Sequence, residues 1–180
     1  MKANKSVIKF LLKFFLVYFV LTGGYSLYLK KTQVKGDFFS CSPITEVVAK
    51  QSKMLIEFLG YQSKTFQNTH QLSMALEVNE KYVAIVVEGC TAMSIMILFL
   101  AFIVAFSGKL KHTLIFGVVG LVSIYIINIF RIAIMSILLY EFPEYQKILH
   151  DLVFPAIIYG YVFLLWVIWV KWFALRTKNE

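Results

Sequence analysis

Hydrophobic residues form four long blocks along the chain, separated by segments that hold nearly all the charges. The uncharged runs cover residues 14–29, 90–106, 114–130 and 152–170. A helix needs about 20 apolar residues to cross the hydrocarbon core of a bilayer, and the shorter runs reach that length when adjoining apolar residues are included. The pattern predicts an all-α polytopic membrane protein of about four transmembrane helices, over residues 10–29, 88–106, 113–139 and 152–173.

The outer loop between the first two blocks, residues 30–87, has shorter periodicities of its own. Ser42-Pro43 is typical of a helix start, because Ser caps unpaired backbone N–H groups and Pro fits the first turn. Apolar residues then recur at helical spacing as far as Gly60, a common stop signal. Farther on, apolar and polar residues alternate over 72–78 and 83–87. We predict an amphipathic helix lying against the outer leaflet or the helical bundle, followed by two short strands or a β-hairpin.

The lysines and arginines predict the orientation of the spans, since short segments rich in positive charge stay in the cytoplasm. These cations gather in the N-terminal tail, between the second and third spans and after the fourth, and the three segments contain one acid, Glu180. Residues 30–88 and 141–151 hold the other nine of the ten acids. The sequence therefore predicts both termini inside and these two segments outside. The first block lacks a small-residue cleavage site, so we expect an uncleaved anchor.

The composition agrees with a membrane location and narrows the function classes. Hydrophobic residues make up 59% of the 180 residues, against roughly 45 to 50% in a soluble domain. The net charge of +8 could suit nucleic acid, but the cations lie at the ends of apolar blocks, where they meet lipid headgroups. We expect membrane lipids and no nucleic acid as partners. Two cysteines, Cys41 and Cys90, are too few for a self-sufficient metal site, and we predict no metal and no cofactor.

Cys90 lies where the outer loop enters the second predicted span, in the run Glu88-Gly89-Cys90-Thr91. In the first turn of a helix, unpaired N–H groups and the helix dipole stabilise a thiolate, the form in which cysteine acts as a nucleophile. Two other interpretations stay open. Cys90 is a small buried residue at a helix start, or it forms a structural disulfide with Cys41 in an oxidising exterior.

Two further polar motifs fall near the same membrane face. Asn128 and Arg131 are three residues apart and share a helix face, and Arg131 lies roughly 27 Å along the third span at 1.5 Å per residue. An arginine in a span indicates a function, unless it snorkels to the headgroups. His150 directly precedes the fourth span and can carry a proton near neutral pH. Together they predict catalytic roles for Cys90, Arg131 and His150, with Asn128 positioning Arg131.

These motifs, in this order, resemble the exosortase and archaeosortase family of membrane cysteine transpeptidases, and the likeness is greatest to short members from Bacteroidota. The matching text runs between residues 82 and 172 and consists of Glu88-Gly89-Cys90-Thr91-Ala92, Asn128-Ile129-Phe130-Arg131-Ile132 and His150-Asp151-Leu152-Val153-Phe154-Pro155. Many members have Gly where this chain has Ala92, and many carry additional helices ahead of the cysteine.

The resemblance implies a membrane cysteine protease or transpeptidase that cleaves the C-terminal sorting signal of secreted proteins at the outer membrane-face junction and transfers them to an acceptor. The implied partners are the C-terminal tail of the substrate and a small membrane partner protein. The implied location is the bacterial cytoplasmic (inner) membrane, with a multi-pass chain whose active site faces the periplasm. The rival function is a non-enzymatic membrane assembly or transporter subunit, in which Arg131 and His150 form a polar contact.

Overall fold

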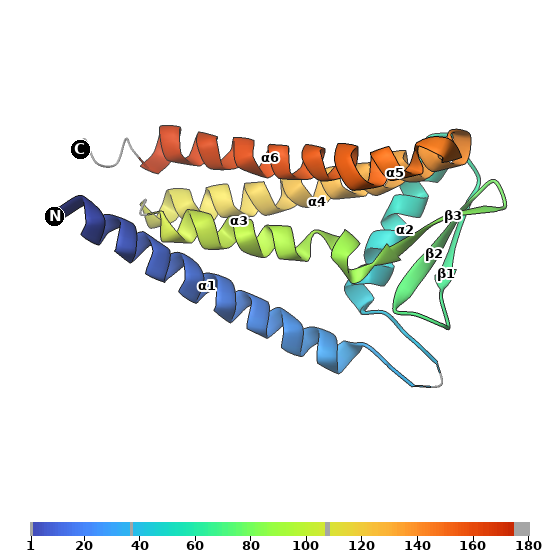
Figure 1. Cartoon of the computed structure of the whole chain (residues 1–180), viewed down its shortest axis with the longest axis horizontal. Helices are drawn as coiled ribbons and strands as arrows, with labels where there is room; N and C mark the ends of the chain where they lie inside the picture. Colours follow the sequence, from blue (N-terminus) through green and yellow to red (C-terminus); the bar gives the residue numbers. More distant parts are fainter. Residues whose placement is uncertain (1, 37, 107–108, 175–180) are drawn as a thin grey trace. The chain divides into compact units, whose positions relative to one another are not determined.

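Helices form most of the chain, and a small sheet interrupts them (Figure 1). The computed structural model describes residues 2–36, 38–106 and 109–174. The helices are α1 (Lys2–Thr32), α2 (Pro43–Phe58), α3 (Met93–Ala105), α4 (Leu110–Glu141), α5 (Gln146–Ile148) and α6 (Phe154–Ile168). The strands are β1 (Ser63–Gln67), β2 (Ser73–Val78) and β3 (Lys81–Val87). Short 3-10 or π turns are η1 (Glu88–Thr91), η2 (Pro143–Tyr145), η3 (Leu149–Val153) and η4 (Trp169–Ala174).

Three helical segments are long and apolar enough to cross a membrane: Lys5–Thr32, Leu110–Glu141 and Pro143–Lys171. They overlap the first, third and fourth predicted spans. The second predicted span, 88–106, is α-helical only over the 13 residues of α3, about 20 Å at 1.5 Å per residue. It is shorter than predicted because the chain turns at Ala92, whose φ of 59° is left-handed. A crossing by α3, and with it a count of four, stays a prediction.

The described residues form two compact units, a helical unit and a mixed unit. The helical unit consists of Met1–Leu27, Met93–Ile124 and Tyr159–Glu180. Aromatic rings join the helices of this unit. Phe102 of α3 stacks on Trp166 of α6, with 4.5 Å between the ring centroids. Phe102 also forms an edge-to-face pair with Phe10 of α1, with 5.8 Å between the ring centroids. Offset and edge-to-face aromatic pairs stabilise packing beyond their buried area, so these rings hold α1, α3 and α6 together.

Gly120 allows α4 to approach α3 closely within the helical unit. A Cβ atom there would lie 2.2 Å from Cζ of Phe99, whose side chain is fully buried. We expect Gly120→Ala to lower the free energy of unfolding by about 1–3 kcal/mol, because an overpacked ring must move. Gly117→Ala is the matched control, since its nearest neighbour is a methyl carbon of Ile103 at an ordinary 3.4 Å. Thermal unfolding in detergent compares the two variants, and equal midpoints would contradict the packing argument.

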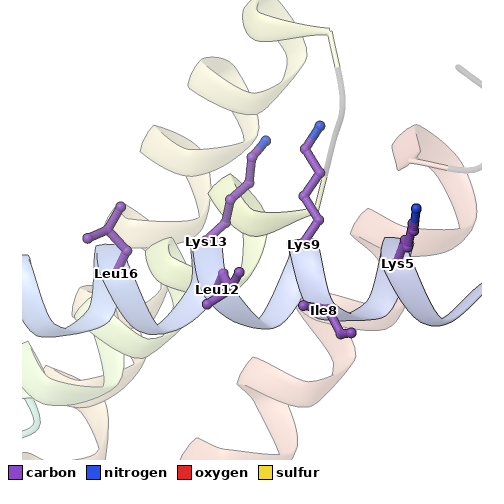
Figure 2. Close-up of a pocket in the computed structure, with 6 residues that line it drawn as sticks. All are labelled: Lys5, Ile8, Lys9, Leu12, Lys13 and Leu16. Atoms are coloured by element: carbon purple, nitrogen blue, oxygen red, sulfur yellow. The ribbon is translucent and has the colours of Figure 1, made fainter.

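A row of lysines follows one face of the first half of α1. Lys5, Lys9 and Lys13 are spaced four residues apart, and Figure 2 shows their side chains extending to the same side of the helix. With Ile8, Leu12 and Leu16 they line an open pocket along α1. Ammonium groups beside apolar residues suit the boundary between lipid headgroups and acyl chains. The row is therefore compatible with membrane lipids as partners, and the N-in orientation remains a prediction.

The mixed unit consists of Tyr28–Ala92 and Tyr125–Ile158 and contains an antiparallel sheet in the order β1-β2-β3. Asn79 and Glu80, both with positive φ, join β2 to β3, as expected for a two-residue hairpin turn. The sequence analysis expected two short strands or a β-hairpin in this part of the chain, and β2 and β3 overlap the two alternating stretches. The all-α description therefore applies to the predicted spans and not to this loop. β1 had no counterpart in the sequence analysis, since Ser63–Gln67 contains a single apolar residue, Phe66.

Helix α2 packs against this sheet and against the second half of α4. It begins where predicted, with Ser42 as N-cap and Pro43 in the first turn, and Gly60 follows its end with a φ of 96°. The buried cluster of the mixed unit contains Val48, Ala49 and Ile56 of α2, Leu76 and Val78 of β2, Val86 of β3, and Ile132 and Ala133 of α4. The face of α2 that carries Val48, Ala49 and Ile56 is therefore covered by protein, whereas Val47, Met54 and Phe58 of the same helix are exposed.

Candidate functional site

Cys90 lies in η1, the 3-10 turn that connects β3 to α3. Its side chain is half-buried, and the turn ends at Ala92. The sequence analysis expected Cys90 inside the first turn of the membrane helix. It lies instead three residues ahead of Met93, the first residue of α3, because the left-handed Ala92 separates η1 from the helix. The thiol is thus presented by a turn between a strand and a helix.

Asn128 of α4 holds this turn directly. Its side-chain Nδ2 donates a hydrogen bond of 2.7 Å to the backbone carbonyl of Cys90, and the Asn128 side chain is 1% exposed. The sequence analysis assigned Asn128 to positioning Arg131, but in the part of the chain that the structure describes no hydrogen bond joins the two. Because a buried amide hydrogen bond fixes its partner's position, the first two sequence motifs meet at the Cys90 turn.

Arg131 follows Asn128 by three residues and therefore lies on the same face of α4. It is half-buried, and its Nε atom, fully buried, has no hydrogen-bond partner among the described residues. The same holds for Oδ1 of Asn128. Buried polar atoms without partners are rare because each costs free energy. Among the described residues, a guanidinium donor of Arg131 and the amide oxygen of Asn128 thus both lack partners on this face of α4.

His150 lies in η3, and its side chain is 66% exposed. Its Nδ1 is 2.9 Å from Oδ1 of Asp151, a contact that orients an imidazole and leaves Nε2 accessible. Within the described ranges, no hydrogen bond or ion pair joins His150 to Cys90 or to Arg131. The structure therefore brings together the Cys90 and Asn128–Arg131 motifs, and it leaves His150 exposed without a bond to either.

Glu88 anchors the Cys90 turn to the start of α2, a role that the sequence analysis missed. One carboxylate oxygen accepts hydrogen bonds from the Ser42 backbone N–H at 2.9 Å and from Nε2 of Gln33 at 3.1 Å. The other accepts from Oγ of Ser42 at 3.0 Å. The available signal was an acid directly before Gly89-Cys90 at the edge of an apolar block. Glu88 thus connects the start of α2, Gln33 after α1 and the Cys90 turn.

The pKa of Glu88 is lowered from its ordinary value of 4.5. Burial alone would raise this pKa, but the hydrogen bonds from Ser42, Thr45 and Gln33 outweigh burial. A carboxyl whose pKa is depressed by folding stabilises the fold above its unfolded pKa, and the stabilisation is lost as the pH falls through the folded pKa. We expect Glu88→Gln to cost about 1–2 kcal/mol at neutral pH. Unfolding of the wild type and of Glu88→Gln at pH 7 and at pH 3 checks this expectation. A difference in unfolding free energy between the two proteins that stays the same at both pH values would contradict it.

Cys41 is a free and inert thiol. It is buried, with Sγ donating to Oε1 of Gln67 at 3.1 Å. Burial, together with the charge of Glu88, raises its pKa from 9.0 to about 11, so it is protonated at neutral pH. Cys90 is also a free cysteine. The structure therefore contains no Cys41–Cys90 disulfide, and Cys41 serves as a built-in control for chemistry at Cys90.

Ala92 occupies a left-handed conformation, with φ 59° and ψ 6°, and is 3% exposed. A β-branched residue is strongly disfavoured in this region, whereas Gly adopts it readily. We expect Ala92→Val to lower the free energy of unfolding by at least about 2 kcal/mol. Ala92→Gly should change it by less than about 1 kcal/mol, since relief of strain offsets the entropy of Gly. Measuring the unfolding free energies of Ala92→Val and Ala92→Gly side by side checks this expectation. Equal stability of the two variants would show that Ala92 is not left-handed.

Comparison with known proteins identifies the family. The sequence profile described as transmembrane exosortase matches residues 5–173, a range that includes Cys90, Asn128, Arg131 and His150. Neither the search of curated proteins nor that of solved structures gave a match. Among the described residues, no three His, Cys, Asp or Glu side chains converge as metal ligands. With its apolar helices and a profile match over nearly its whole length, the chain belongs to the transmembrane exosortase family.

Proposed function

We propose that the protein is a membrane cysteine protease or transpeptidase that removes the C-terminal sorting signal of secreted proteins. The observation that carries the proposal is the hydrogen bond from Asn128 to the Cys90 carbonyl. It fixes the Cys90 turn beside the face of α4 that carries Arg131, whose buried Nε lacks a partner in the described part of the chain. The Cys90 thiol and the Arg131 guanidinium are the two kinds of group that acyl transfer requires, a nucleophile and a donor for the oxyanion.

The first step is attack by the Cys90 thiolate on the scissile carbonyl carbon. A sulfur–carbon bond forms, and the carbonyl oxygen becomes an oxyanion that Arg131 stabilises by a charge-assisted hydrogen bond. The carbon–nitrogen bond then breaks, and protonated His150 gives its proton to the leaving amine. The products are a thioester on Cys90 and the released C-terminal tail.

The second step transfers the acyl group from Cys90 to an acceptor. Neutral His150 removes a proton from the acceptor, which attacks the thioester carbonyl and regenerates the Cys90 thiolate. Water as acceptor gives hydrolysis, and an amine or hydroxyl gives a conjugate. The exposed His150 must approach the thiol in the substrate complex, where hydrogen bonds between catalytic groups tighten. Asp151, 2.9 Å from Nδ1 of His150, orients the ring for this exchange.

The substrate fits the predicted location of these groups. Its tail would contain a recognition motif, an apolar helix and a basic end, and the helix would pack against the bundle. This arrangement presents the junction between motif and helix to Cys90 at the periplasmic face of the inner membrane. A small membrane protein would supply additional helices beside this core.

The proposal is tested by comparing the C-termini of secreted proteins in host cells. Cells without this gene are complemented by the wild-type chain or by His150→Ala, and C-terminal peptides are sequenced by mass spectrometry. We expect wild-type cells to release proteins without their apolar C-terminal helix and His150→Ala cells to retain it. The mass of the new C-terminus identifies water or another acceptor. Identical C-termini in all strains would exclude the proposed activity.

A further inference from the structure

Strand β3 has an unpaired edge that leads to Cys90. β3 is the last strand of the sheet, and β2 is its only strand neighbour among the described residues. No backbone hydrogen bond connects Lys81–Val87 to any other described segment. An edge strand directs about half of its N–H and C=O groups away from its neighbour. The outer edge of β3 therefore offers a row of backbone donors and acceptors for an added strand.

This edge has one protective feature, a bulge at Val83, and lacks the others beyond its first residue. Proteins protect exposed edges with charged residues or proline, yet β3 contains neither after Lys81, its first residue. The strand is rich in β-branched residues, and Tyr82 and Ile85 are 54% and 36% exposed. The opposite edge strand, β1, is polar and carries Lys64 near its middle. The chain thus leaves open the one edge that continues into the cysteine turn.

The connection between β3 and Cys90 points to the occupant. Val87 ends the strand, and Cys90 lies three residues later in η1, about 6 Å along a 3-10 helix. We infer that the outer edge of β3 binds the extended substrate segment that precedes the scissile bond, by adding it as a fourth strand. Backbone hydrogen bonds then provide affinity, and alternate side chains provide specificity. The inference rests on the proposed function and adds to it the substrate conformation and the surface that binds it.

The direction of the added strand follows from chain connectivity. β3 runs toward Cys90 and then continues into the apolar helix α3. The substrate likewise runs from its recognition segment through the scissile bond into an apolar helix. With α3 predicted to enter the membrane, both chains do so after their extended segments, and we expect the substrate strand to be parallel to β3. In parallel pairing, alternate residues of the added strand donate and accept hydrogen bonds with β3.

Site-specific photo-crosslinking tests this inference with a matched control on the same sheet. Ile85 of β3 and Phe66 of β1 both pair with Ala75 of β2, so their side chains lie on one face in a single row. A benzophenone analogue of phenylalanine replaces Ile85, Tyr82 or Phe66 in the full-length chain carrying Cys90→Ala. The probe's target is the unprocessed protein that accumulates in Cys90→Ala cells. The same three variants with Cys90 intact report whether each one folds and processes tails.

We expect adducts with the unprocessed protein from positions 85 and 82 and none from position 66. The adduct from Tyr82 should fall N-terminal to the adduct from Ile85 in the substrate sequence, because the strands are parallel. The inference is overturned by any of four results: adducts in the opposite order, adducts at position 66 alone, adducts between two copies of this chain, or no adducts from β3. If Cys90-dependent processing persists in that case, only the edge proposal fails. If wild-type cells process no tails, the proposed function itself fails.

Discussion

Cys90→Ala is expected to abolish the removal of C-terminal tails, with a loss of about 10⁴-fold or more, the scale on which loss of a nucleophile acts. Cys41→Ala should leave the rate unchanged. The Cys41 thiol is buried, its pKa is raised to about 11 by burial and the charge of Glu88, and its partner Gln67 keeps a bond to the Cys41 backbone N–H. Pulse-labelled cells followed by mass spectrometry of C-termini give both rates.

The comparison of the two cysteines also separates catalysis from stability. Both substitutions remove a thiol from the mixed unit, so a merely structural role would reduce protein levels in either variant. We expect both variants to accumulate to the wild-type level and to unfold at similar temperatures. Equal losses of processing in the two variants would point to a structural requirement for thiols and would remove Cys90 as the nucleophile.

Arg131→Gln is expected to slow tail processing by about 10² to 10³-fold, the usual cost of losing one oxyanion donor. Gln retains hydrogen-bonding capacity but has no charge to offset the oxyanion. Arg131→Lys should recover part of the rate, because it restores the charge without the planar set of donors. Single-turnover processing in detergent, with a purified unprocessed protein, separates this step from substrate binding.

Lys111→Gln is the control for Arg131→Gln, since it removes an exposed cation from the same helix. Its processing rate should match that of the wild type. Thermal unfolding should show little change for either variant, because the Nε atom of Arg131 has no partner to lose among the described residues. A normal rate for Arg131→Gln would remove the guanidinium from the chemistry.

The sequence predicts best those elements whose ends are determined by neighbouring residues. The N-cap at Ser42, Pro43 in the first turn and the stop at Gly60 are determined by neighbouring residues, and α2 follows them. β1 has no such signal, because Ser63–Gln67 becomes a strand only through pairing with β2. The early end of η1 and the short α3 were equally hidden, since a left-handed conformation is uncommon for alanine.

The order of the motifs predicts which residues form the site, but it carries no information on their contacts. No local signal indicates that Asn128 bonds to the carbonyl of Cys90, a partner 38 residues away, because such a pairing depends on how α4 meets the turn. Glu88 was likewise overlooked, since its partner Ser42 is 46 residues away. The catalytic roles of Cys90, Arg131 and His150 stay predictions.

Capture of the acyl intermediate tests the central claim most directly. Membranes containing the wild-type chain are quenched in acid during processing, and peptides that contain Cys90 are analysed by mass spectrometry with and without neutral hydroxylamine. The account predicts a secreted protein, cut at its tail junction, attached to Cys90 by a thioester that hydroxylamine cleaves. Tail processing that proceeds with Cys90 never acylated would contradict it.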